Sequence, residues 1–280
     1  MNILKVIILI VVLTVVWLFL RSYVGNISIN DIISGQRLEV TDAELWDEES
    51  PLSGSVILDI AHGANMEDPE SEYLKLLASR SNDGVIDMTG WSIQSVVSDT
   101  RIYIPQATLM LKMKKGYNSL QKVFLSPGEY LILRTGHSPI REYAKSFHTN
   151  KCIGYLNQFI KFNPKIKLTC PKPDTILPAT VANVRTYGSE CIDFLANADR
   201  CTTYTTAMPA NLLPVCRDLI ARKLTYHACL SESFEKEGHD IFNNGGWYIY
   251  LGLGAEVWRN NYEAIRLLDA DGKVVAVLRY

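Results

Sequence analysis

The stretch LSPGEYLIL spans residues 125–133 and joins a turn to a strand. Pro127 and Gly128 form a pair typical of turns, because proline fixes φ and glycine accepts a positive φ. The four residues from Tyr130 to Leu133 are apolar at both alternating sets of positions. Successive side chains of a strand point to opposite faces, so this strand is expected to be buried on both. The sequence therefore predicts a central strand, or one that another part of the chain covers.

Seven further short apolar runs accompany this strand. Segments rich in glycine, asparagine, aspartate or proline separate them at roughly ten-residue intervals, without long helices between them up to Arg134. This pattern predicts an all-β sandwich or barrel. The last two runs flank Asp269 to Gly272, which suits a four-residue hairpin with Gly272 at positive φ. The expected strands are Ser55–Ala61, Glu72–Ala78, Gly90–Ser95, Arg101–Ile104, Ala107–Leu111, Ala264–Leu268 and Lys273–Leu278.

Two motifs and their surroundings are similar to those of a known family. Asp-x-x-Gly-Trp-Ser-Ile covers residues 87–93, and Leu-x-Pro-Gly-Glu-Tyr-Leu covers residues 125–131. With their surroundings, they resemble the lamin tail domain, an immunoglobulin-like β-sandwich of nuclear lamins and of many bacterial envelope and secreted proteins. The resemblance covers residues 55–137 and 245–280 and implies a binding or scaffold role. Further matching segments are Glu72–Leu76, Val85–Met88, Ile104–Pro105, Ile132–Leu133, Trp258, Ile265–Asp269 and Asp271–Val275.

Large apolar residues at these motifs are the expected core. Trp91 opens a strand with Ile93 on the same face, and a large aromatic side chain anchors many sandwich cores. We expect the following residues in or against the core: Trp91, Ile93, Tyr130, Ile132, Trp258, Ile265 and Leu267.

The region from about residue 150 to 240 has a different texture. Ser189–Ala198 and Asn211–Lys223 carry apolar residues at helical spacing, and Pro214 suits a first helical turn. We therefore predict a partly helical insertion between two pieces of one β domain. The insertion departs from the lamin version of the family and looks like its membrane-anchored bacterial variants.

All six cysteines lie in this insertion. Their even number and confinement favour disulfides in an oxidising compartment over a structural metal or free buried thiols. Intervals of 17, 20, 9, 14 and 12 residues between them provide no CxxC pair for a metal. Six cysteines allow 15 pairings. We expect Cys152–Cys170, Cys191–Cys229 and Cys201–Cys216.

The N-terminal segment has the character of a membrane span. Residues 6–20 read VIILIVVLTVVWLFL, flanked by Lys5 and Arg21, with Trp17 near one end. A cleaved secretory signal would need small residues where the sequence has WLFLRSYVG, and a buried core helix is the other alternative. We expect an uncleaved single-pass anchor, and the cysteines place the body outside the cytoplasm.

Charge and motifs restrict the function classes. With 28 Lys+Arg against 30 Asp+Glu the formal net charge is −2, which argues against nucleic acid as the main partner. The sequence has no HExxH, GxSxG, GxxxxGK[ST] or GxGxxG motif. One basic patch (Lys112, Lys114, Lys115 and Lys122) is a candidate for an anionic ligand, although ordinary surface lysines explain it more simply.

Three weaker candidates have simple structural alternatives. The first candidates for an enzyme site assembled from loops are Asp59, His62 and His239. The alternative interpretation is that they are scattered surface residues. Gly252 to Gly254 is read as a bulge or turn in a strand over Tyr248–Val257, rather than a phosphate loop. An acidic cluster resembles a calcium site only in composition, and a solvated loop is the simpler reading. The cluster comprises Glu67, Asp68, Glu70 and Glu72.

These observations combine into one expectation. The chain is predicted to have an anchor over 1–21, a stalk over 22–54, an immunoglobulin-like sandwich over 55–149 and 241–280, and a disulfide-rich insertion over 150–240. The expected function is a membrane-anchored, extracytoplasmic, non-catalytic binding or scaffold module of the cell envelope. It needs no cofactor, and its partner is a protein or an envelope polymer. The alternatives are an envelope hydrolase and a cell-surface DNA-binding protein.

Overall fold

The computed structural model describes residues 48–59, 64, 66–205 and 208–280. Within them the fold is β-rich, with helices and three disulfides, as expected. The expected anchor over 1–21 and most of the stalk lie outside the described residues. No helix within the described ranges is long and apolar enough to cross a membrane. The first strands are β1 (Val56–Asp59), β2 (Tyr73–Ala78), β3 (Ile86–Asp87), β4 (Ser92–Ser95), β5 (Arg101–Tyr103) and β6 (Phe124–Leu125). The remaining ones are β7 (Tyr130–Arg134), β8 (Phe147–His148), β9 (Gly246–Tyr250), β10 (Ala264–Leu268) and β11 (Val274–Arg279).

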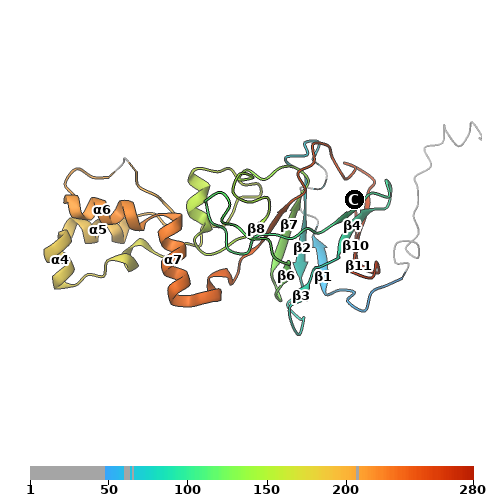
Figure 1. Cartoon of the computed structure of the whole chain (residues 1–280), viewed down its shortest axis with the longest axis horizontal. Coiled ribbons are helices and arrows are strands. Elements are labelled where there is room, and N and C mark those ends of the chain that lie inside the picture. Colours follow the sequence, from blue (N-terminus) through green and yellow to red (C-terminus); the bar gives the residue numbers. More distant parts are fainter. Residues whose placement is uncertain (1–47, 60–63, 65, 206–207) are drawn as a thin grey trace, which may run out of the picture. The chain divides into compact units, whose positions relative to one another are not determined.

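Two sheets account for nine of these strands. The first has the order β1-β2-β7-β9-β8, and the second has the order β11-β10-β4-β5. Neighbouring strands are antiparallel except β7 and β9, which run parallel with Ile132 opposite Tyr248. The chain between those two strands is therefore a long crossover connection. Figure 1 shows β1, β2 and β7 beside β4 and β10, with β11 close to them.

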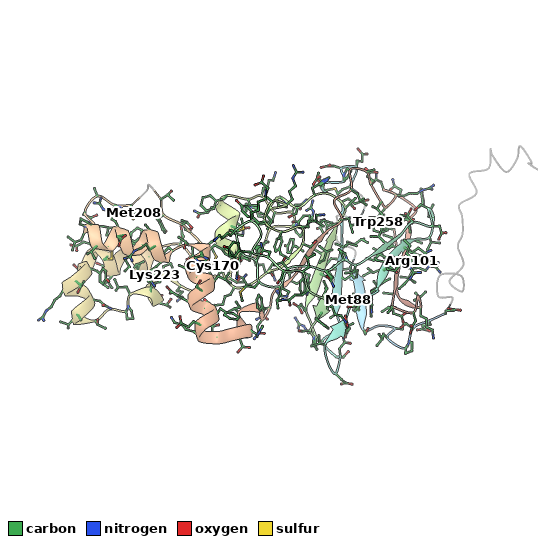
Figure 2. The ribbon with its side chains drawn as sticks, viewed as in Figure 1. Met88, Arg101, Cys170, Met208, Lys223 and Trp258 are labelled. Carbon is green, nitrogen blue, oxygen red and sulfur yellow. A yellow bond between two sulfur atoms is a disulfide. The ribbon has the colours of Figure 1, made fainter. Side chains whose placement is uncertain are left out.

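A hydrophobic core lies between the two sheets. It contains Trp91, Ile93 and Trp258 together with Leu131 and Leu133 from β7. Both tryptophans are only 2% exposed, and Met88 and Trp258 are labelled in the strand-rich part of Figure 2. Ile265 and Leu267 complete the set expected in this core. Five of the seven expected core residues therefore lie between the sheets, and the other two, Tyr130 and Ile132, do not.

Strand β7 is buried on its other face as well. Ile132 and half-buried Tyr130 belong to a second hydrophobic cluster. Tyr248 of β9 lies in the same cluster and stacks on Phe147, with ring centroids 5.8 Å apart. The prediction of a central strand is confirmed, and its second face packs against the region that follows it.

Helices occupy this following region. Every helix among the described residues lies between Ile153 and Phe242. The two expected helices are present as α5 and α6, and Pro214 occupies the first turn of α6. Two helices were not foreseen, and each has a threonine N-cap, Thr180 for α4 and Thr225 for α7. The α-helices are α4 (Val181–Tyr187), α5 (Ser189–Asn197), α6 (Pro214–Lys223) and α7 (Tyr226–Glu237). Three 3-10 helices accompany them: η1 (Ile153–Gln158), η2 (Pro173–Ile176) and η3 (Gly238–Phe242).

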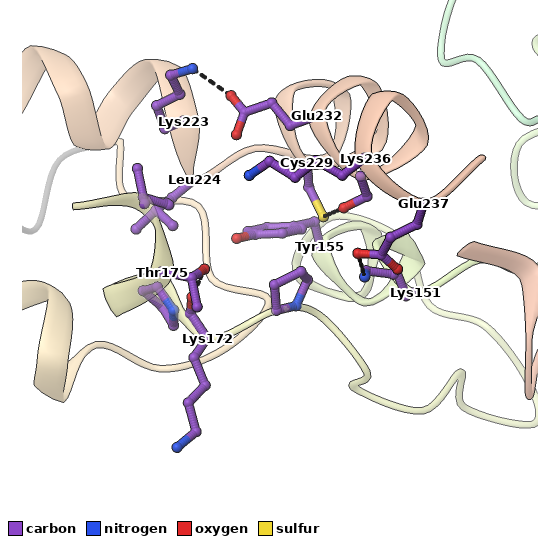
Figure 3. A pocket seen from close by; sticks show the side chains of 14 residues that line it. Lys151, Tyr155, Lys172, Thr175, Lys223, Leu224, Cys229, Glu232, Lys236 and Glu237 are labelled. Carbon is purple, nitrogen blue, oxygen red and sulfur yellow. Dashed lines mark hydrogen bonds and ion pairs between the residues drawn. The ribbon is translucent and has the colours of Figure 1, made fainter. Parts of the chain in front are cut away.

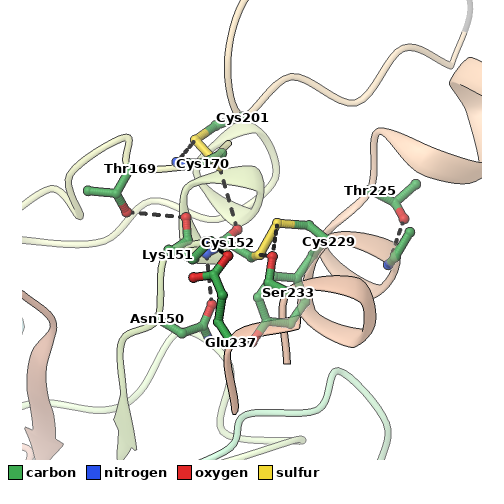
Figure 4. The surroundings of a disulfide bond; sticks show 12 residues. Asn150, Lys151, Cys152, Thr169, Cys170, Cys201, Thr225, Cys229, Ser233 and Glu237 are labelled. Carbon is green, nitrogen blue, oxygen red and sulfur yellow. Dashed lines mark hydrogen bonds and ion pairs between the residues drawn. A yellow bond between two sulfur atoms is a disulfide. The ribbon is translucent and has the colours of Figure 1, made fainter. Parts of the chain in front are cut away.

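Three disulfides connect all six cysteines, but the expected pairing is wrong. The bonds are Cys152–Cys229, Cys170–Cys201 and Cys191–Cys216. Figure 4 shows the first of these joining the start of η1 to α7, with the Ser233 hydroxyl beside both sulfurs. The error arises because α7 folds back onto η1, which brings residues 77 positions apart together.

Two expected strands differ in the structure. Ala107–Leu111 is not a strand: Ala107 and Thr108 form isolated bridges, and Leu111 enters the second core. The strand expected over Tyr248–Val257 ends at Tyr250, because its partner β7 ends at Arg134. Beyond that point Gly252 takes a φ of +73° and the chain forms a loop, which corresponds to the turn reading of this segment.

The predicted hairpin between β10 and β11 is confirmed and is held by Asp269. Its Oδ1 accepts bonds of 2.9 Å from the backbone amides of Asp271 and Lys273, and Gly272 has a φ of +86°. Its Oδ2 accepts a 2.5 Å bond from the Ser50 hydroxyl. Residues 48–54 thereby lie along β11, where Glu49 forms a parallel bridge with Val274. Burial raises the pKa of Asp269, but these hydrogen bonds outweigh it and leave the pKa below its usual 3.8.

We predict that Asp269→Asn lowers the free energy of unfolding at pH 7 by about 1–2 kcal/mol. Because the folded-state pKa of Asp269 is lowered, the carboxylate stabilises the fold above pH 3.8. This stabilisation is lost as the pH falls through the folded-state pKa. The gap between wild type and variant should therefore shrink below about pH 4 in urea unfolding curves. Asp271→Asn, an exposed residue of the same turn, serves as the control. A gap that stays constant with pH contradicts this assignment.

Candidate functional site

The lysine patch is an ordered loop at the surface. Asn118 holds it, accepting from the Lys112 amide at 2.7 Å and donating to the carbonyls of Lys112 and Tyr143. Lys114 lies over the Tyr117 ring at 3.9 Å. Lys122 forms an exposed ion pair with Asp87 at 3.3 Å. The four lysines are exposed, and two of them have partners within the chain.

The structure does not bring the described candidate residues of an enzyme site into contact with one another. Asp59 pairs with Lys75 at 2.8 Å across β1 and β2. His239 lies in η3, where its ring contacts the rings of Phe234 and Phe242. His62 is outside the described residues. Among the residues that the structure describes, no hydrogen bond or ion pair joins Asp59 to His239, and no group of three or more His, Cys, Asp or Glu side chains could hold a metal ion.

The acidic cluster divides into residues with separate structural roles. Asp68 caps a turn by accepting from the Glu70 amide and the Ser71 hydroxyl. Glu72 is 0% exposed and accepts from the Thr135 hydroxyl and from the amides of two residues on a distant loop, Val257 and Trp258, at 3.0 Å each. Burial raises the pKa of Glu72, and these hydrogen bonds oppose the rise.

A first cavity, of about 280 Å³, lies between η2 and α7 in the helical region. Figure 3 shows Tyr155 in its interior and Lys223 bonded to Glu232 at its rim. Lys151 bonds Glu237 on the other side. Four lysines (Lys151, Lys172, Lys223 and Lys236) and two glutamates line it, so its wall carries an excess of positive charge.

A second and larger cavity, of about 780 Å³, opens where β7 and β9 end. Because the strands are parallel, their carboxyl ends meet at one edge, and Arg134 lies opposite Tyr250. We call this cavity the strand-end cleft. Its charged lining residues are Arg134, Arg141, Lys161 and Lys165, facing Asp68, Glu70 and Glu142.

Arg134 is the exceptional residue of this cleft. Its side chain is 3% exposed, and its Nε and Nη1 are buried without a hydrogen-bond partner among the described residues. Its guanidinium carbon lies 5.8 Å from the centroid of the Tyr250 ring. Burial lowers the pKa of Arg134, with Glu70 acting in the opposite direction. An arginine remains protonated through such a shift, so the cleft contains a buried positive charge.

Tyr250 supplies a second buried polar group without a partner in the described structure, its hydroxyl. Burial raises its pKa well above the usual 10, so it remains a neutral hydroxyl that can donate. Glu70, an acidic residue whose charge acts on both groups, is bonded elsewhere. It accepts from the backbone amide of His137 at 3.0 Å and contacts the ring Nδ1 of His137 at 2.9 Å.

No pattern in the sequence indicates this cleft as a whole. Its one sequence signal is Arg134, a charged residue that directly follows three apolar positions of a doubly buried strand. Tyr250 occupies the equivalent place at the end of β9. The other lining residues come from loops whose proximity only the fold establishes.

Two comparisons with known proteins find no match for this chain. No protein-family model matches the chain, and no curated protein is significantly similar to it. The function is therefore proposed from the chain's own sequence and structure.

Proposed function

We propose that this chain is a membrane-anchored, extracytoplasmic and non-catalytic binding module of the cell envelope. Its scaffold is an immunoglobulin-like sandwich of the lamin tail type, and its binding surface belongs to the helical region and the adjoining sheet edge. The membrane anchor is the apolar segment over residues 1–21, and the partner is a protein or an envelope polymer.

The sandwich supports the resemblance on which the proposal draws. Trp91 and Trp258 are buried between two sheets, and the Pro127–Gly128 turn precedes a central strand. The pairing of all six cysteines supports an oxidising compartment, because disulfides persist mainly outside the reducing cytosol.

One observation carries the binding role. Residues of the crossover between β7 and β9 form the whole wall of the first cavity and most of the wall of the second. This crossover is fastened by three disulfides and packs a second core on the sheet, so it presents its cavities on a rigid support. Rigid concave surfaces with a few charged groups are typical of ligand sites.

The location and the oxidation state can be tested together. In intact protoplasts, an external protease should remove an epitope tag fused after Tyr280, while a cytosolic tagged protein stays protected. Non-reducing mass spectrometry of the same protein should find the three disulfides and no alkylated cysteine. A protected tag with cysteines that react under native conditions would refute an extracytoplasmic location.

A further inference from the structure

We propose that the strand-end cleft binds the carboxylate of a small ligand, held by Arg134 and Tyr250. The inference deepens the proposed binding function by naming the chemical group that is recognised. The ligand's source is either an acidic sugar or a peptide terminus, since both carry the same carboxylate.

Arg134 lacks the hydrogen-bond acceptors that its buried guanidinium needs. A buried charge is costly unless hydrogen bonds and an opposite charge compensate it. Arg134 has the Tyr250 ring beside it, but its buried Nε and Nη1 have no acceptor in the described structure. A guanidinium presents donors in a planar fork that matches a carboxylate. A carboxylate bound in one of its two forks therefore provides the opposite charge and an acceptor for one of these two nitrogens.

Tyr250 contributes a second unpartnered donor beside Arg134. Tyr250 lines the strand-end cleft, and its hydroxyl is buried without a partner in the described residues. Arg134 and Tyr250 are directly opposite each other at the ends of two parallel strands. Strand ends hold side chains more firmly than mobile loops do, so the two groups form a prepared pair.

The acidic side chain whose charge acts on Arg134 already has partners within the chain. Glu70 lines the cleft, but His137 engages both of its oxygens through the backbone amide and one of them through the ring. Glu70 therefore faces the cleft edge already satisfied, and it does not bond Arg134. The guanidinium keeps its capacity for an external acid.

The charge of the lining favours a carboxylate over other anions. The cleft is lined by four basic and three acidic side chains, so it is nearly balanced in charge. The single charge of a carboxylate matches the formal net charge of +1 that this lining carries, whereas the charge of a phosphate dianion exceeds it. The acidic side chains suit hydroxyl or ammonium groups on the rest of the ligand. The volume of about 780 Å³ accommodates a sugar or a peptide end.

The test is a binding titration of the full-length chain in a non-ionic detergent, with its disulfides intact. The probes are galacturonate and N-acetylalanine, and their matched controls are galacturonamide and N-acetylalaninamide. We expect at least one acid to bind in the range of about 1 mM or tighter, with its amide at least tenfold weaker. Binding of galacturonate alone indicates an acidic sugar, and binding of N-acetylalanine alone indicates a peptide terminus. If neither acid binds, or if phosphate binds as tightly, the inference is wrong.

Two variants connect the binding to the named groups. Arg134→Met should reduce acid binding at least tenfold and, because it removes an uncompensated buried charge, raise Tm by a few degrees. Tyr250→Phe removes only the hydroxyl and should weaken binding several-fold without lowering Tm. Exposed Arg185→Met and Tyr103→Phe are the matched controls and should bind as wild type does.

Opposite results separate this inference from a structural role. If Arg134→Met lowers Tm and Tyr250→Phe retains full binding, Arg134 serves the fold and the inference fails. If Arg134→Met does not fold, the Tyr250→Phe titration decides alone. Failure here leaves the protease and cysteine measurements unaffected, so the proposed function and the carboxylate site are tested independently.

Discussion

Replacing Cys152 and Cys229 together by alanine should lower the free energy of unfolding by about 4.5 kcal/mol. The bond closes a loop between residues 77 positions apart, the widest separation of the three. In the chain-entropy description, a longer closed loop restricts the unfolded state more. The bond also fastens η1 to α7, two elements of the second core. Its loss should therefore exceed the loss from either of the other bonds.

The measurement is denaturant unfolding followed by tryptophan fluorescence, with the Cys191→Ala and Cys216→Ala double variant as the reference. That bond spans 25 positions, and its removal should cost about 3.5 kcal/mol. All four cysteines are buried, so loss of packing affects the two variants similarly. Equal losses, or a larger loss for the shorter loop, would show that chain entropy does not govern these bonds.

Glu72→Leu should lower the free energy of unfolding by about 3 kcal/mol or more, since each buried group left without a partner costs about 1–3 kcal/mol. The carboxylate of Glu72 accepts from the amides of Val257 and Trp258 and from the Thr135 hydroxyl. Leucine fills a similar volume but accepts no hydrogen bond. The loop that carries Trp258 into the sandwich core would lose its attachment to the start of β2.

Glu72→Gln is the matched control, because it keeps one oxygen acceptor and the shape. It should cost less than half of the leucine effect in the same unfolding experiment at pH 5. Similar losses for both variants would mean that volume and not hydrogen bonding determines the contribution of Glu72.

The wild-type protein and Glu72→Gln also provide a test by the pH dependence of stability. Burial raises the folded-state pKa of Glu72 above the usual 4.5. A raised carboxyl pKa means that the folded state binds more protons than the unfolded state just above pH 4.5. The stability due to Glu72 is thus fully present below pH 4.5 and declines as the pH rises through the folded-state pKa. The stability of wild type relative to Glu72→Gln should fall across this range; a rise would contradict the assignment.

Local patterns were sufficient to predict most strands and two helices. Tyr130 to Leu133 is apolar on both faces, and β7 is the strand that packs two cores. The turn from Asp269 to Gly272 contains an aspartate that accepts from a backbone amide of the turn and a glycine at positive φ. It forms the predicted hairpin. Such features depend on neighbours in the sequence, so the sequence displays them directly.

Features that depend on the fold were missed. Cysteine spacing says nothing about which residues a folded-back helix brings together, and the pairing was wrong for that reason. Helix α7 has four buried residues among twelve positions, so its apolar pattern is weak. The residues of the strand-end cleft come from β7, β9 and three loops, and only Arg134 stands out in the sequence pattern.

The Cys152–Cys229 disulfide also determines whether a proteolytic cut in the helical region separates the molecule into two parts. Any single cleavage between Cys152 and Cys229 separates the backbone into two fragments, but one cysteine of the bond lies on each fragment. The nicked molecule migrates as one species until a reductant is added. Clipping of the helical region by a protease would therefore leave both halves at the membrane or in solution together, and gel electrophoresis without reductant would not detect it.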